Sequence, residues 1–164
     1  VSDFVWFRQA MPWLGPGFVY CVHEDALDIL RGDLARHRFN IVSLDGTAMT
    51  DGPSFHAEAK RAFGFPDYYG SNWDAFNDCL GETRLAHPTA ILWSAAEVLV
   101  SSDLKTFAEA IAEFSRFRDA FKRADPRTVE VADPVQVELL LLGRGKGFRR
   151  PDDPIAPSWQ RLPL

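Results

Sequence analysis

Apolar and polar residues follow two different periods along the chain, and the pattern predicts strands and helices in alternation. Short apolar runs bounded by turn residues are typical of strands, whereas apolar residues three or four positions apart are typical of helices. Strands are predicted at residues 17–22, 39–44, 89–93 and 135–142. Helices are predicted at residues 23–38, 54–63, 71–80 and 102–124. Ser54 is the expected N-cap of its helix, because a serine oxygen can accept a bond from the first free backbone amides.

This alternation predicts an α/β fold with a parallel sheet. A strand–helix–strand connection is right-handed and makes its two strands parallel. The run Val135–Leu142 is the most hydrophobic of the predicted strands, as in strands that are covered on both faces of a parallel sheet. We therefore expect helices on the faces of a small parallel sheet.

The composition excludes several classes of protein. Of 164 residues, 46% are hydrophobic, which is too apolar for a disordered chain. The apolar runs are far shorter than the roughly 20 residues of a membrane helix, and no signal-peptide pattern opens the chain. Cys21 and Cys79 are too few for a disulfide framework and lack the spacing of metal ligands. We expect a cytoplasmic protein without cofactor, metal site or membrane contact.

Charge is distributed unevenly along the chain. The net charge is −5, but residues 143–164 carry +3, which leaves −8 for residues 1–142. An acidic body disfavours a nucleic-acid-binding surface and favours a basic partner. The run 143–147 (GRGKG) is superficially similar to a phosphate-binding loop but lacks its spacing. Residues 143–164 are thus expected to form a flexible, basic, Pro- and Gly-rich tail, with no more than weak, salt-sensitive contact to RNA.

The segment 65–81 (FPDYYGSNWDAFNDCLG) holds the candidate chemistry. On a helical wheel its apolar residues share one face, and Asp74 and Asp78 lie on the other. Asp74 fits the acid of a capping box that begins at Ser71. Asp78 has no such explanation, because no basic residue lies three or four positions away. Two interpretations remain open: an ordinary solvated face, or an acidic surface that binds a cationic partner.

The residues before this helix favour binding over catalysis. Tyr68 and Tyr69 provide rigid amphipathic surface of the kind enriched in binding hot spots. Gly70 either brings the backbone close to a partner or makes the turn. Two carboxylates on one exposed helix provide no cleft for acid–base hydrolysis, and no nucleophile elbow, HExxH or Walker pattern occurs. We do not expect an enzyme.

The same segment closely resembles the motif Tyr-Tyr-Gly-x-Asn-x-Asp-Ala-x-x-Asp-Cys-Leu of the barstar family, which comprises intracellular inhibitors of secreted ribonucleases. The similarity extends over residues 39–142. It implies a three-layer arrangement in which helices pack round a small parallel sheet. Residues 1–38 would add a strand–helix unit to this domain, and residues 143–164 would follow it as the tail.

The resemblance implies inhibition by phosphate mimicry. Asp78 would take the place of an RNA phosphate in the basic active site of a secreted-type microbial ribonuclease, and Asp74 would pair at the rim of that site. Tyr68 would pack on the catalytic histidine of the nuclease. The expected partner-binding residues are Tyr68, Tyr69, Gly70, Asn72, Trp73, Asp74, Asn77, Asp78 and Asp119.

Three positions qualify this expectation. Asn77 and Thr83 stand where the family has aromatic residues, so the target is expected to be a different ribonuclease of the same general type. Asp119 corresponds to a further acidic contact of the family, and it equally fits a solvated helix face. The alternative function is an adaptor or RNA-associated protein of this fold that uses residues 1–38 and the basic tail.

Overall fold

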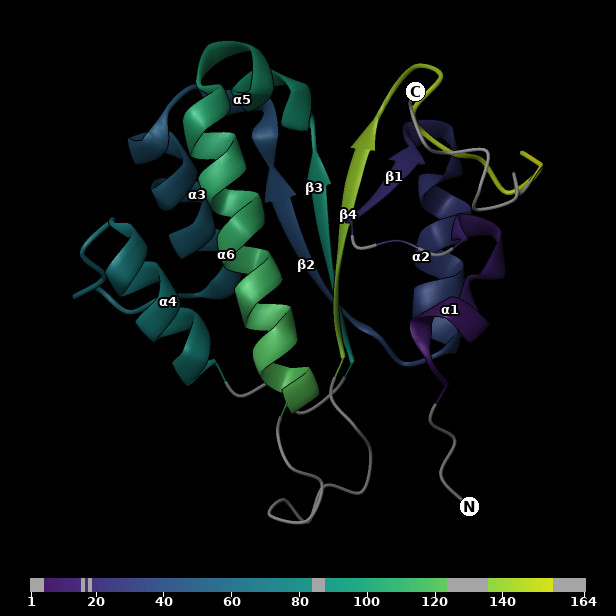
Figure 1. The fold of residues 1–164 in the computed structure, drawn as a ribbon, viewed down its shortest axis with the longest axis horizontal. Coiled ribbons are helices and arrows are strands. Elements are labelled where there is room, and N and C mark those ends of the chain that lie inside the picture. Colours follow the sequence, from purple (N-terminus) through teal and green to yellow (C-terminus); the bar gives the residue numbers. More distant parts are fainter. Residues whose placement is uncertain (1–4, 16, 18, 84–87, 124–135, 155–164) are drawn as a thin grey trace.

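Four strands form a single parallel sheet at the centre of the protein (Figure 1). The computed structural model describes residues 5–15, 17, 19–83, 88–123 and 136–154. The strands are β1 (Val19–His23), β2 (Asn40–Asp45), β3 (Thr89–Ser94) and β4 (Val137–Gly143). Their order across the sheet is β1-β4-β3-β2. The predicted α/β class with a parallel sheet is confirmed.

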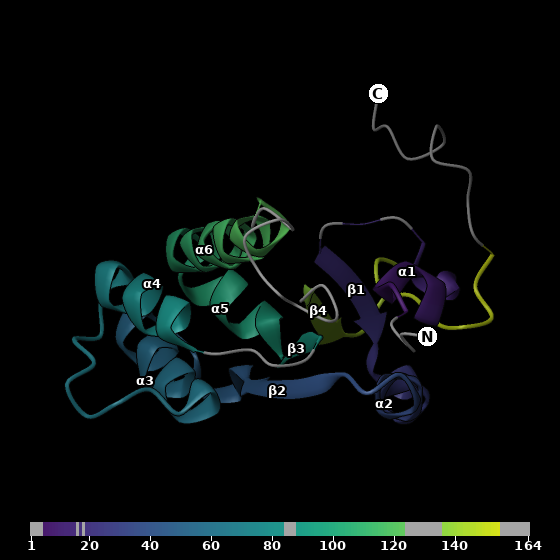
Figure 2. The same ribbon diagram turned by 90° about the horizontal axis from the view of Figure 1, so that it is seen from below.

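Helices cover both faces of the sheet and complete three layers. They are α1 (Phe7–Ala10), α2 (Leu27–Arg36), α3 (Gly52–Phe63), α4 (Trp73–Glu82), α5 (Ala96–Ser102) and α6 (Leu104–Arg123). The helices α3 to α6 lie on one face, and α1 and α2 on the other (Figures 1 and 2). Short 3-10 turns lie at Pro12–Leu14, Glu24–Ala26 and Gly46–Ala48. Within the described residues, none of the helices is long and apolar enough to cross a membrane.

The sheet separates two hydrophobic cores, and β3 contributes to both. Ile91 and Trp93 pack into the core beneath α3 to α6. Ala90 and Leu92 point the other way, into the core beneath α1 and α2. This two-sided burial explains why the central strands are continuously apolar in sequence. The sheet is thus extended by β1, and its second face is covered by α1 and α2.

The start of α3 differs from the prediction. Its N-cap is Asp51, not Ser54, which occupies the third helical position. The Ser54 amide donates to Asp51 Oδ1 at 2.9 Å, and the Asp51 amide donates to Ser54 Oγ at 3.0 Å. The two residues thus form a reciprocal capping box, and the predicted boundary was wrong because Ser54 is the second member of that box.

The predicted helix 102–124 corresponds to α6, and a short helix that was not predicted, α5, precedes it. Residue Asp103 separates them, and its Oδ1 accepts a bond from the Thr106 amide at 3.0 Å. A carboxylate that caps the next helix ends one helical run and begins another. The sequence prediction missed α5 because no glycine or proline marks this break.

The segment that follows β4 pairs with the end of β1 through Arg149. The Arg149 amide donates to the Cys21 carbonyl at 2.9 Å, and the His23 amide donates to the Arg149 carbonyl at 2.8 Å. These bonds form a parallel bridge between Val22 and Arg149. The first part of the segment predicted as a flexible tail therefore lies along the edge of the sheet, and residues 155–164 lie outside the described residues.

Candidate functional site

The loop between α3 and α4 is anchored in the core by its aromatic residues. Phe65 and Tyr69 are buried, and their rings lie 4.9 Å apart between centroids. The Tyr69 hydroxyl lies 2.5 Å from Nδ1 of His56 on α3. Tyr69, a predicted partner-binding residue, is only 7% exposed. The structure therefore places its ring beneath the loop rather than on the surface.

The contact between His56 and Tyr69 is electrically neutral. Burial lowers the pKa of His56 below its ordinary value, because an imidazolium ion would lose hydration in the core. Burial also raises the pKa of the Tyr69 hydroxyl. Both groups are thus held in their uncharged forms, and they join the loop to α3 through one buried hydrogen bond.

Tyr68 has the opposite placement and is 75% exposed. Its hydroxyl donates to Glu82 Oε2 at 3.3 Å, at the carboxyl end of α4. The negative charge of Glu82 raises the pKa of Tyr68. The ring therefore lies over the end of α4 and next to its acidic face.

The start of α4 is set by Asn72, whose Oδ1 accepts a bond from the Ala75 amide at 2.9 Å. The predicted capping box of Ser71 and Asp74 is wrong, because Ser71 has a positive φ of 51° and precedes the N-cap. The side-chain amide nitrogen of Asn72, Nδ2, also donates to the Gly70 carbonyl at 3.2 Å. A side chain at Gly70 would meet this amide at 3.1 Å, so Gly70 leaves room for the capping residue.

The outer face of α4 carries a row of three carboxylates. Asp74, Asp78 and Glu82 are all exposed and follow one another at intervals of four residues. None of the three has an ion-pair partner among the residues that the structure describes. Like charges at this spacing repel by a few tenths of a kcal/mol, so this face is electrostatically unfavourable in the free protein.

The inner face of α4 is held against α3 and α6. The Trp73 ring packs on Phe55 and His56, with centroids 5.2 and 4.8 Å away. Its indole N–H donates to Glu109 Oε2 on α6 at 2.9 Å. Trp73 and Asn77 are only half-buried, so each retains some surface beside the acidic row. This packing makes α4 a rigid support for its carboxylates.

Asp119 lies on a separate element, in the carboxyl-terminal part of α6, where it is half-buried. The helices α4 and α6 pack against each other. The remaining predicted residues lie along one continuous segment, from the loop through α4, whereas Asp119 belongs to the neighbouring helix.

The family described as barstar (barnase inhibitor) matches residues 39–132, which is more than half of the chain. The chain belongs to the barstar family. The match covers the anchored loop, the acidic row and α6, whereas β1, α2 and β4 lie outside it. A comparison with curated proteins gives no significant match.

One carboxylate of the row on α4 was not predicted from the sequence. Glu82 extends the row of Asp74 and Asp78 by one further helical turn and also contacts Tyr68. Its spacing of four residues from Asp78 was the available signal, but the predicted helix ended at Leu80. In the described part of the chain, no three His, Cys, Asp or Glu side chains are grouped to hold a metal ion.

Proposed function

We propose that this barstar-family protein binds a secreted-type microbial ribonuclease in the cytoplasm and blocks its basic active site. The row of exposed carboxylates on α4, for which the described residues offer no ion-pair partner, carries this proposal. Asp78, at the centre of the row, takes the position of an RNA phosphate. Asp74 pairs with a basic group at the rim, and Glu82 adds charge at the other end.

The repulsion within the row of carboxylates favours the complex with a cationic partner over the free protein. Repulsion between successive carboxylates is relieved when arginine, lysine or protonated histidine groups of a nuclease lie against them. Charge complementarity accelerates the encounter, and desolvated charge pairs slow dissociation. Because Trp73 and its neighbours hold α4 in place, little conformational freedom is lost on binding.

The other motif residues divide between contact and support. Tyr68, the exposed aromatic residue of the loop, provides the rigid surface that packs on the nuclease. Gly70 and Asn72 shape the turn and start the helix. Tyr69 supports the loop from below, and Trp73 and Asn77 contribute only their exposed edges. Asp119 is proposed as an accessory acidic contact from α6.

The direct test is RNA hydrolysis by a panel of secreted microbial guanyl-type ribonucleases, with and without the purified protein. We expect stoichiometric inhibition of at least one enzyme. The association rate should fall between about 0.05 M and about 0.5 M salt, because screening shortens the range of the charges. Absence of inhibition, combined with binding of RNA by the protein itself, would favour the RNA-associated alternative.

A further inference from the structure

A pocket lies at the carboxyl ends of β1 and β4. These strand ends lie at the opposite end of the molecule from α4 (Figures 1 and 2). The pocket has a volume of about 650 Å³, within the range of roughly 300–1,000 Å³ typical of small-molecule sites. Its lining residues are His23, Gly145, Lys146, Phe148, Arg149, Arg150, Asp153 and Pro154. All lie outside residues 39–132, so the pocket is separate from the part that matches the barstar family.

The topology of the sheet favours a ligand at this point. After β1 the chain leaves to α2 on one face, whereas after β3, on the other side of β4, it leaves to α5 and α6 on the opposite face. In open α/β sheets, ligands bind outside the carboxyl ends of strands where the connections diverge in this way. The segment 144–154 closes one side of this crevice.

The wall of the pocket is anchored by backbone pairing and by a close ring contact. The backbone amide of Arg149 is bonded to the Cys21 carbonyl of β1, and its carbonyl accepts from the His23 amide. The Phe148 ring lies against Gly143, where an added Cβ would come within 2.5 Å of Phe148 Cζ. The glycine therefore allows the ring to form an apolar part of the wall.

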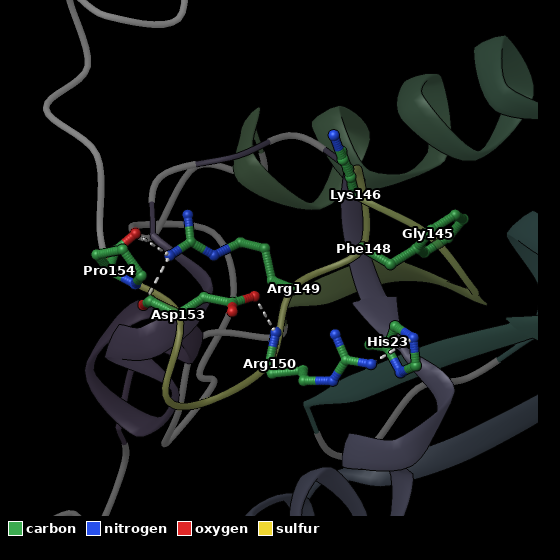
Figure 3. Close-up of a pocket in the computed structure, with 8 residues that line it drawn as sticks. All are labelled: His23, Gly145, Lys146, Phe148, Arg149, Arg150, Asp153 and Pro154. Atoms are coloured by element: carbon green, nitrogen blue, oxygen red, sulfur yellow. Dashed lines mark hydrogen bonds between the residues drawn. The ribbon is translucent and has the colours of Figure 1, made fainter.

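Arg150 is already paired with side chains of the protein itself. The Arg150 guanidinium contacts Asp25 Oδ2 at 3.1 Å and His23 Nε2 at 2.8 Å (Figure 3). The lining carboxylate, Asp153, accepts a bond from the Arg150 backbone amide at 2.7 Å. Arg150 and Asp153 thus organise the floor of the pocket, and its two other cationic residues, Lys146 and Arg149, outnumber the single lining carboxylate, Asp153.

Arg149 and Lys146 carry this excess of positive charge. Arg149 Nη2 donates to the carbonyls of Asp153 and Pro154, at 3.4 and 3.2 Å, which leaves the positive charge uncompensated. Its Nε is buried without a hydrogen-bond partner in the described structure. Neither Arg149 nor Lys146 has a carboxylate partner among the described residues. In Figure 3, the Lys146 amine and a second guanidinium nitrogen of Arg149 point the same way, away from His23.

We propose that this pocket binds a small phosphate ester of about the size of a mononucleotide. A planar guanidinium and a lysine ammonium together match phosphate oxygens, the first through paired bonds and the second as a point charge. Phe148 supplies the apolar surface for the rest of the ligand. The run 143–147 lacks the spacing of a phosphate-binding loop, but it contributes Gly145 and Lys146 to the lining of this pocket.

Calorimetric titration of the full chain tests this site, with inorganic phosphate and a 5′-nucleoside monophosphate as separate probes. We expect saturable binding of both, tighter for the ester. Arg149→Gln and Lys146→Gln should each weaken binding by about tenfold or more, since each removes a charged contact. Lys146 is exposed, so its variant tests the site even where Arg149→Gln disturbs the fold.

Two controls separate this site from general charge effects and from the proposed inhibition. Arg36→Gln removes an exposed positive charge on α2, and Asp78→Asn alters the acidic row; both should leave binding of the ester unchanged. Absence of saturable binding, equal losses in Arg36→Gln and Lys146→Gln, or binding of inorganic phosphate alone would overturn the proposal. If an oligonucleotide that lacks terminal phosphates bound as tightly as the nucleoside monophosphate, the proposal would be overturned, and the pocket would instead bind the backbone of a nucleic acid.

Discussion

Tyr68 and Tyr69 are adjacent in the chain, yet they perform different physical tasks. One ring is 75% exposed above the acidic face, and the other is 7% exposed beneath the loop. The buried hydroxyl is bonded to His56, whereas the exposed one contacts Glu82 near solvent. A tyrosine hydroxyl in the core needs its partner far more than one at the surface does.

Removing the two hydroxyl groups in turn should therefore affect stability unequally. Tyr69→Phe leaves His56 Nδ1 buried without its bond, and we expect a loss of about 1–3 kcal/mol in the free energy of unfolding. Tyr68→Phe is its matched control and should change that energy by no more than about 0.5 kcal/mol. Urea denaturation measures both variants. Equal losses would show that the buried hydrogen bond does not stabilise the loop.

His56 should also make stability depend on pH. Its pKa is lowered by burial, so below about pH 6.5 the unfolded chain binds a proton that the folded chain does not. The contribution of His56 to the free energy of unfolding should thus be constant above about pH 7 and decrease as the pH falls through the window below 6.5. Carboxylates such as Asp51 and Asp103, whose pKa values are lowered by hydrogen bonds, lower the free energy of unfolding only when they are protonated at more acidic pH.

Denaturation at a series of pH values measures this contribution. His56→Gln should remove the decrease between about pH 7 and pH 5, and His37→Gln, which removes a different histidine, should retain it. The prediction fails if the His56 variant keeps the same slope as the unmodified protein.

At the scale of the elements, the two faces of α4 were predictable from the sequence, but its start was not. Ser71 and Asn72 are both good N-cap residues, and periodicity cannot choose between them. The backbone decides: Asn72 has the extended φ of −139° that an N-cap needs, whereas Ser71 is left-handed. The short α5 was missed for a related reason, since it begins after Ala95 in a left-handed conformation that no glycine signals.

Alanine substitutions at the two positions should identify the cap. Asn72→Ala removes the acceptor for the Ala75 amide, and we expect a loss of about 1 kcal/mol in stability. Ser71→Ala should have little effect, within about 0.5 kcal/mol. Thermal or urea unfolding distinguishes them, and a larger loss for Ser71→Ala would contradict the cap assignment.

At the scale of the whole molecule, the N-terminal unit and the barstar-like part share one sheet. The sequence predicted all four strands and a parallel sheet, because long apolar runs identify buried strands, but not the order of the strands. The pairing of Arg149 with β1 was not predictable, because it joins distant residues and the segment has no apolar period. Since β4 lies between β1 and β3, we expect the described elements to unfold together.

A core substitution in α2 tests this integration. Leu30 is 0% exposed in the core of the second face, whereas its neighbour Ile29 is 52% exposed. Leu30→Ala should cost about 2–5 kcal/mol and lower the stability seen by probes in both halves of the chain. Ile29→Ala should change stability by about 0.5 kcal/mol or less. Two separate transitions, with only the N-terminal one affected, would contradict a single cooperative sheet.

The most direct test of the central claim is the affinity of Asp78→Asn for a ribonuclease that the unmodified protein inhibits. The substitution keeps the shape of the side chain and removes its charge, so the protein should remain folded while the dissociation constant rises about tenfold or more. Asp28→Asn removes a carboxylate that is exposed on α2 and should leave the dissociation constant unchanged. Equal affinity of the Asp78 variant and the unmodified protein would contradict phosphate mimicry by the acidic row.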